Sequence, residues 1–158
     1  MKLYHFSPIK NEKELIKVIK YVAIQNSKLS KKIVGKSLPI KSLTVFSHYS
    51  SEFEKLVKIL LKLGNPHNEH NGPRIILHIP VKVLGNSITH LRIRKPDPYR
   101  MQVGCSDFVV ENYQNFKKVN LGKNKNLRLI KRQEYEYIEF FHPDFDVLGY
   151  VVSDSIHF

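Results

Sequence analysis

A short segment near the middle of the chain places three basic side chains at alternate positions. Residues 88–94 alternate in a way that predicts a half-buried β-strand. Because successive side chains of a strand point to opposite faces, His90, Arg92 and Arg94 share one face. Two guanidinium groups and an imidazole at this spacing can bind a phosphate or a carboxylate, since each arginine offers paired donors in a fixed fork. This face is therefore an anion receptor, an exposed edge with ordinary charges, or part of a buried salt-bridge network.

Three neighbouring residues extend the receptor hypothesis. Arg100 and Gln102 follow this strand after a proline-containing segment and can continue its polar lining. Arg74 begins an apolar strand that we expect beside residues 88–94 in the same sheet. The ligand-binding residues predicted from sequence are thus His90, Arg92, Arg94, Arg74 and Gln102.

The overall charge favours an anionic partner. The 158 residues include 26 Lys and Arg against 14 Asp and Glu, which gives a formal net charge of +12. Such an excess is typical of proteins that bind nucleic acid or phosphorylated small molecules, although a soluble lysine-rich protein would show it too. The hydrophobic share of 42% and the charged share of 25% are ordinary for a globular chain that builds one core.

Cysteine usage and hydropathy restrict the compartment. Cys105 is the single cysteine, which excludes an intramolecular disulfide and a cysteine-based zinc site. No apolar run approaches the roughly 20 residues that span a bilayer, and the first residues turn polar too early for a signal peptide. We expect a cytoplasmic protein with no membrane partner.

Residues 1–39 predict a helical extension. Within residues 12–25 an apolar stripe recurs at helical spacing and includes Leu15, Ile19 and Val22. Residues 27–36 are rich in lysine and serine and predict a linking segment, with at most a second short helix. The stripe is too apolar to remain in water, so it should pack on the rest of the chain or across a homodimer interface.

Residues 40–158 repeat one order of elements. The first half predicts a strand at 43–48, a helix at 51–63 and strands at 66–70, 74–79 and 88–94. The second half predicts a strand at 101–110, a helix at 112–119 and strands at 127–132, 135–141 and 147–153. The expected fold class is α+β, with two βαβββ modules that form a cupped mixed sheet within a single domain.

Local signals mark the joints between these elements. Ser51 and Glu54 predict a capping box at the start of the first helix, and Gly64 predicts its end. Asn71 and Gly72 predict a tight turn. Residues 95–99 contain two prolines and should form a rigid joint between the modules.

Several of these segments resemble a known superfamily. The turn at 71–73, the strand that follows it, and the Pro96-Asp97-Pro98 segment are similar to those of the vicinal oxygen chelate (glyoxalase/bleomycin-resistance-like) superfamily, nearest its YecM-type branch. Residues 140–144 also resemble a strand end common in that superfamily, and the resemblance covers about residues 40–153. It implies paired modules curled around a ligand site, which in many members holds a divalent metal through His and Glu ligands.

The chain departs from the metal-binding pattern of that superfamily. Ser42 and Ser106 align where first-strand histidines would stand, Arg94 aligns with a carboxylate position, and Gly149 or Tyr150 occupies the last-strand position. A cation in place of a ligand repels a metal. The resemblance thus implies a divergent domain without the usual metal ligands and without a cofactor, which binds a phosphorylated small molecule or nucleic acid in a basic cup.

A second interpretation stays open, and with it the question whether the protein is an enzyme. If the alignment is displaced, His48, His90 and Glu139 could hold a divalent metal in a metal-dependent enzyme of the same superfamily. Glu139 is the single carboxylate in an otherwise apolar stretch, and it could instead pair with Arg92 or Arg94 across the cup.

Overall fold

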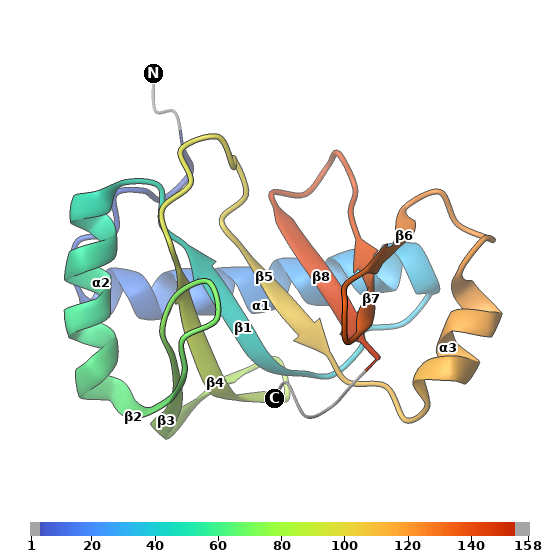
Figure 1. Cartoon of the computed structure of the whole chain (residues 1–158), viewed down its shortest axis with the longest axis horizontal. Helices are drawn as coiled ribbons and strands as arrows, with labels where there is room; N and C mark the ends of the chain where they lie inside the picture. The colour runs from blue at the N-terminus through green and yellow to red at the C-terminus, as the bar shows by residue number, and fades with distance from the viewer. Residues whose placement is uncertain (1–3, 154–158) are drawn as a thin grey trace.

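The computed structural model describes residues 4–153 of the chain. These residues form one eight-stranded mixed sheet and three α-helices (Figure 1). The strand order is β2-β3-β4-β1-β5-β8-β7-β6. The molecule therefore has the α+β fold class that the element pattern predicted.

The sheet consists of two halves with the same connectivity. The first half contains β1 (Ile40–Phe46), α2 (Ser50–Leu63), β2 (Gly64–Asn68), β3 (Arg74–Val83) and β4 (Asn86–Arg94). The second half contains β5 (Gly104–Phe108), α3 (Tyr113–Asn120), β6 (Leu127–Lys131), β7 (Glu136–Phe140) and β8 (Val147–Val152). In each half three antiparallel strands end on a strand that runs parallel to the first one. The two first strands, β1 and β5, pair antiparallel at the centre, so the predicted βαβββ repeat is confirmed.

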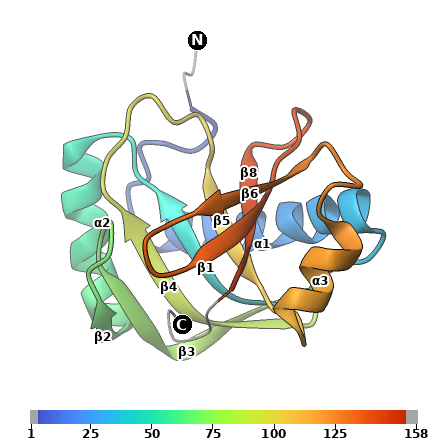
Figure 2. The same cartoon turned by 45° about the vertical axis from the view of Figure 1, so that its right-hand side comes forward.

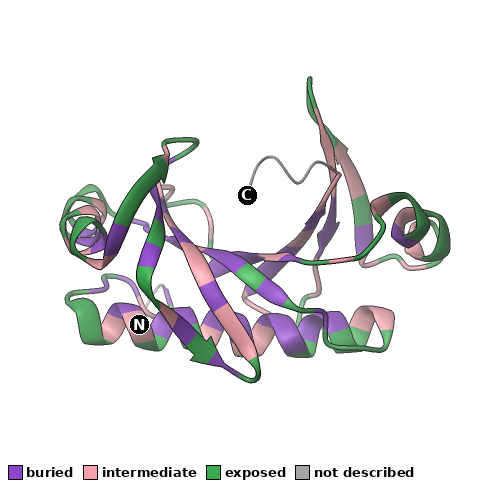
Figure 3. Cartoon of the chain, turned by 90° about the horizontal axis from the view of Figure 1, so that it is seen from below, coloured by how far each residue is buried: buried purple, intermediate pink, exposed green. Residues whose placement is uncertain are grey.

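The sheet is curved, and its convex face holds the core. Helix α1 (Glu12–Val34) runs along this face and turns its buried side toward the strands (Figure 3). Leu15, Ile19 and Val22 on that side are fully buried and belong to the same cluster as Leu43 and Leu91 of the sheet. The apolar stripe is therefore covered by the chain's own sheet, which leaves it unavailable as a dimer interface.

Helices α2 and α3 lie at the two ends of the sheet, and both hairpins of the outer strands turn away from α1 (Figures 2 and 3). Helix α2 packs on β2, β3 and β4. Phe116 of α3 stacks on Phe140 of β7 with ring centroids 6.0 Å apart. With all three helices packed this way, the opposite, concave face of the sheet is the one left for a ligand.

The predicted linking segment at 27–36 is wrong, because α1 continues to Val34. Two of its serines are buried inside the protein and satisfy polar groups of the following turn. The Ser30 hydroxyl accepts from the amide of Leu38 at 3.0 Å, and the carbonyl oxygen of Ser27 accepts from the Ser37 hydroxyl at 3.1 Å. The helix ends at Gly35, whose φ of 82° is the left-handed conformation that glycine adopts without strain.

Helix α2 ends at Gly64 as predicted, but the residues at both of its ends act differently from expectation. Helix α2 begins after Tyr49 with no side-chain cap from a serine, so the capping box is wrong. The carboxylate of Glu52 instead reaches back and accepts from the amide of His48 at 2.7 Å. Gly64 is extended, and it is required because a Cβ there would collide with the carbonyl of Ile76 on the paired strand.

The turn at Asn71 and Gly72 is confirmed, with positive φ at both residues. A Cβ at Gly72 would collide with the carbonyl oxygen of Ile93, so the glycine lets the β2–β3 hairpin lie directly against the end of β4. The predicted strand at 101–110 is shorter than expected and comprises β5 alone. No helix within residues 4–153 is long and apolar enough to cross a membrane.

Candidate functional site

The concave face of the sheet contains a cavity of about 610 Å³. This volume lies within the usual range for small-molecule sites. We call it the cup. Its floor is built by the alternate residues of the central strands that point away from α1, among them Thr44, Cys105 and Asp107. Its walls come from β3 and β4 on one side and from the β6–β7 hairpin on the other.

The lining of the cup separates the two kinds of basic residue. The chain contains six arginines and 20 lysines. All six arginines line the cup, namely Arg74, Arg92, Arg94, Arg100, Arg128 and Arg132, whereas none of the lysines in residues 4–153 does. The described lysines are exposed apart from the partly buried Lys117. The arginines are thus concentrated in one concave site, and the lysines cover the outer surface.

Two of these arginines use their donors in hydrogen bonds that stabilise the cup. Arg92 donates to the carbonyl oxygen of Gly72 and to Oδ1 of Asn68, both at 2.7 Å, and also to the carbonyl oxygen of His70. It therefore fixes the β2–β3 hairpin. Arg74 is buried and donates from Nη2 to the hydroxyl of Ser42 at 2.7 Å. Strands β3 and β4, which carry Arg74 and Arg92, both lie inside the sheet, so these two side chains do not belong to an exposed edge.

Two other arginines keep most of their donors available. Arg94 lies over the ring of Phe46, at 4.7 Å from its centroid, and approaches Asp97 at 3.9 Å. Within residues 4–153 the guanidinium of Arg100 makes no hydrogen bond or ion pair, although it acts electrostatically on Tyr150. Both belong to the end of β4 and the joint that follows it. They are therefore the best-placed donors for an anion.

The second half of the sheet contributes two arginines and three tyrosines. Arg128 donates from Nε to Oε1 of Glu139 at 2.6 Å. Arg132 donates to the hydroxyl of Tyr137 at 2.9 Å. The ring of Tyr137 meets that of Tyr150 edge to face, with centroids 5.0 Å apart. Glu139 does face the cup and pairs with an arginine, but its partner is Arg128 and not Arg92 or Arg94.

A partly buried acid stands at the centre of the floor. Asp107 on β5 is in register with Ser42 on β1 and with Tyr150 on β8. Burial raises the pKa of the Asp107 carboxyl, while Arg74, a hydrogen bond from Ser42 and Arg92 act to lower it. Asp107 was not among the residues predicted from sequence, and neither were Arg128 and Arg132.

The reason for missing Asp107 is a displacement of one residue. Ser106, which the alignment placed in the cup, points to the convex face, where its hydroxyl accepts from Nδ2 of Asn26 on α1 at 2.8 Å. The cup-facing neighbours are Cys105 and Asp107. A shift of one residue moves every side chain of a strand to the other face. Five of the six arginines lie in segments predicted as strands, and this was a signal that could have pointed to Arg128 and Arg132.

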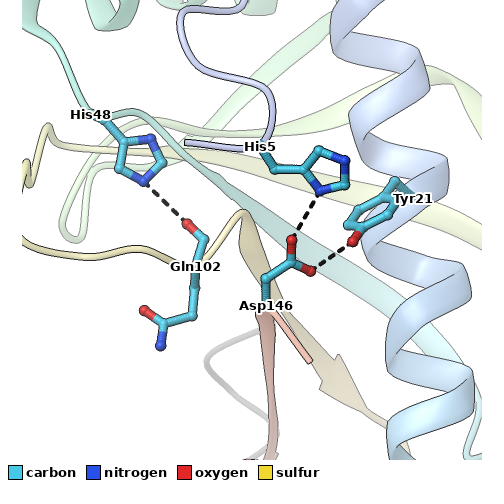
Figure 4. Close-up of polar contacts among 5 residues, drawn as sticks. All are labelled: His5, Tyr21, His48, Gln102 and Asp146. Atoms are coloured by element: carbon cyan, nitrogen blue, oxygen red, sulfur yellow. Dashed lines mark hydrogen bonds and ion pairs between the residues drawn. The ribbon is translucent and has the colours of Figure 1, made fainter. Parts of the chain in front are cut away.

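Two predicted binding residues lie outside the cup lining. The ring of His90 packs edge to face against His67, with centroids 5.2 Å apart. Burial, followed by the nearby charges of Arg74, His67 and Lys41, lowers the pKa of His90 to about 4. His90 is therefore neutral at neutral pH and adds no positive charge. Gln102 contributes its backbone carbonyl to His48, and its side-chain amide points away from that ring (Figure 4).

The residues of the metal-dependent interpretation occupy separate places. His48 is buried, with Nδ1 at 2.6 Å from the Ser7 hydroxyl and Nε2 at 3.1 Å from the carbonyl oxygen of Gln102. Glu139 lies in the cup, and His90 lies beside His67. Among the residues that the structure describes, no three His, Cys, Asp or Glu side chains are grouped as metal ligands would be.

A polar cluster outside the cup fastens the N-terminal segment. Asp146 accepts from the hydroxyl of Tyr21 at 2.7 Å and lies 3.0 Å from Nδ1 of His5 (Figure 4). Burial, followed by the hydrogen bond to Asp146, raises the pKa of Tyr21. Through these contacts the cluster links the start of β8 to α1 and to the segment before α1. The contacts therefore explain the cluster as a structural link.

Comparisons with known proteins inform the fold alone. No protein-family model matches the chain, and no curated protein matches it significantly. A solved structure described as the structural-genomics protein EC4020 is similar over 99% of this chain and 93% of the other, with a TM-score of 0.68 and 12% sequence identity. At that identity the likeness shows that the two chains share the paired βαβββ architecture.

Proposed function

We propose that the cup binds an anionic small molecule, with a phosphorylated compound as the first candidate. The observation that carries this proposal is the placement of all six arginines, and of no described lysine, in one cavity. Arginine is preferred over lysine where a planar fork must hold a phosphate or carboxylate through two hydrogen bonds. A chain that needed charge only for solubility would have no reason to separate the two residues in this way.

The geometry favours a small molecule over nucleic acid. The arginines converge on a concave site, whereas the lysines that would contact an extended phosphate backbone are spread over the outer surface. Arg94 and Arg100 are expected to provide the principal contacts because their donors are the least committed. Arg74 and Arg92 would contribute indirectly, by shaping the site and adding positive electrostatic potential.

We also propose that the chain is a divergent relative of the vicinal oxygen chelate superfamily. The paired βαβββ halves and the concave ligand site support this relation. The arginine lining supports a change from metal chelation to direct anion binding.

The test is calorimetric titration with inorganic phosphate and simple phosphate esters. The double variant Arg94→Gln/Arg100→Gln should weaken binding by about tenfold or more, since the loss of one charge-assisted contact already corresponds to such a factor. The control is Lys13→Gln/Lys17→Gln, which removes the same charge from the exposed side of α1. Equal weakening by both double variants would show that the attraction is diffuse, and preferential binding of nucleic acid over the esters would contradict a small-molecule site.

A further inference from the structure

The two carboxylates that line the cup have different partners. Glu139 is paired directly with Arg128, from Nε at 2.6 Å. Asp107 forms no ion pair with any residue in the described range 4–153. Its link to a guanidinium runs through Ser42, whose hydroxyl accepts from Arg74 at 2.7 Å and hydrogen-bonds the Asp107 carboxylate. Glu139 is thus held in a direct ion pair, whereas Asp107 interacts with the guanidinium groups of Arg74 and Arg92 only at longer range.

The position of Asp107 places it where a ligand would rest. It lies on β5, one of the two central strands, between Ser42 of β1 and Tyr150 of β8, and it lines the cup. A carboxylate has about four acceptor sites on its two oxygens. The Ser42 hydroxyl supplies one hydrogen, so the carboxylate retains acceptor capacity toward the cavity.

An acceptor of this kind has a definite effect in a site lined by arginines. It repels a bare anion, and it binds a group that donates hydrogen bonds. The ligand that satisfies both features carries its anionic group toward Arg94 and Arg100 and a hydroxyl group toward Asp107. A ligand without the donor would leave the carboxylate with unfilled acceptors, and sites built around such a polar group discriminate strongly against the analogue that lacks the partner.

We propose that Asp107 is a specificity-determining residue and that the ligands of the cup are phosphate esters of hydroxylated compounds, such as polyol and sugar phosphates. This inference rests on the proposed anion binding. Asp107 selects among anions, and the arginines provide the affinity that all of them share.

The experiment compares two esters of equal charge and chain length, glycerol 3-phosphate and propyl phosphate, by calorimetric titration. The wild-type protein should prefer glycerol 3-phosphate by about tenfold or more. Asp107→Leu should reduce this preference to near one, while the affinity for propyl phosphate stays the same or rises. Asp107→Asn keeps one acceptor oxygen without the charge, so it should retain a smaller preference, and thermal melts of each variant check that it is folded.

The outcomes separate the two proposals. Equal binding of both esters by the wild type, or an unchanged preference in Asp107→Leu, overturns the role of Asp107 while anion binding stands. If Asp107→Leu does not fold, an unchanged preference in Asp107→Asn overturns it in the same way. If neither ester nor inorganic phosphate binds, both proposals fall.

Discussion

The guanidinium of Arg92 donates to the carbonyl oxygen of Gly72 at 2.7 Å and joins the end of β4 to the turn between β2 and β3. The same side chain donates to Asn68 at the end of β2. Alternation in the sequence assigned Arg92 to ligand binding, but its guanidinium donates hydrogen bonds to the protein itself. This separates the contribution of Arg92 to stability from the contribution of Arg94 and Arg100 to binding.

We expect Arg92→Gln to lower the free energy of unfolding by about 2 to 3 kcal/mol, because the carbonyl oxygens and the amide it binds lose a charged donor. Urea denaturation followed by circular dichroism measures this change. Lys95→Gln is the matched control, since it removes an exposed charge three residues further along the chain and should change stability by less than about 0.5 kcal/mol. Equal stability of Arg92→Gln and wild type would contradict the structural role.

The sequence predicted the fold more completely than the site. Alternation placed Arg92 and Arg94 on one face of β4, and it placed Leu91 and Ile93 on the other, where both are fully buried. Such patterns are local, so they can be recognised without knowing which strands are neighbours. The element order then identified the repeated module.

Predicting the site required contacts between residues far apart in the chain, which local sequence patterns do not contain. Asp107 and Ser42 are 65 positions apart in the chain and meet through the register of β1 with β5. Arg128 reaches the cup because the β6–β7 hairpin curls over one side of the sheet (Figure 2). Alternation shows that two residues share a face, but the curvature of the sheet decides which faces meet across a cavity. For Arg92, alternation predicted the correct face of the strand. Its hydrogen-bond partners, which alternation does not predict, give it a structural role.

The apolar stripe of α1 provides a second prediction. Ile19 is fully buried against the sheet, so Ile19→Asp should destabilise the protein by about 3 to 5 kcal/mol through a lost apolar contact and an unpaired buried charge. Lys20→Asp, at an exposed position of the same helix, is the control. Thermal melts measure the difference. If Ile19→Asp melts like the wild type but changes its oligomeric state, the stripe belongs to an interface between copies and not to the core.

A third prediction concerns the single thiol. Cys105 is buried, and burial raises its pKa to about 12, so the reactive thiolate is scarce at pH 8. We expect the folded protein to react with iodoacetamide at least about tenfold more slowly than the protein in urea. Mass spectrometry of timed samples measures both rates. Equally fast alkylation in both states would mean that the floor of the cup opens to solvent.

The lowered pKa of His90 gives a fourth prediction, on the pH dependence of stability. Its pKa falls from an ordinary value of 6.5 to about 4 in the folded protein. Above pH 6.5 the ring is neutral in both states and contributes no pH dependence. Between pH 6.5 and pH 4 the unfolded chain binds a proton that the folded chain does not, so stability falls as the pH falls. Below pH 4 both states are protonated and the loss is complete.

We expect His90→Gln to recover about 1 to 2 kcal/mol of this loss at pH 4 relative to its own stability at pH 7, once solvent screening of a half-buried ring is taken into account. Urea denaturation at both pH values measures the difference between variant and wild type, which removes the contribution of the carboxylates that both share. His78→Gln, at an exposed position on the neighbouring strand β3, is the control for the loss of a histidine side chain. Proton NMR supplies the direct check, because the ring signals of His90 should titrate near pH 4. A midpoint near 6.5 would mean that the ring is open to solvent, and His90 would then add a positive charge beside the cup below that pH.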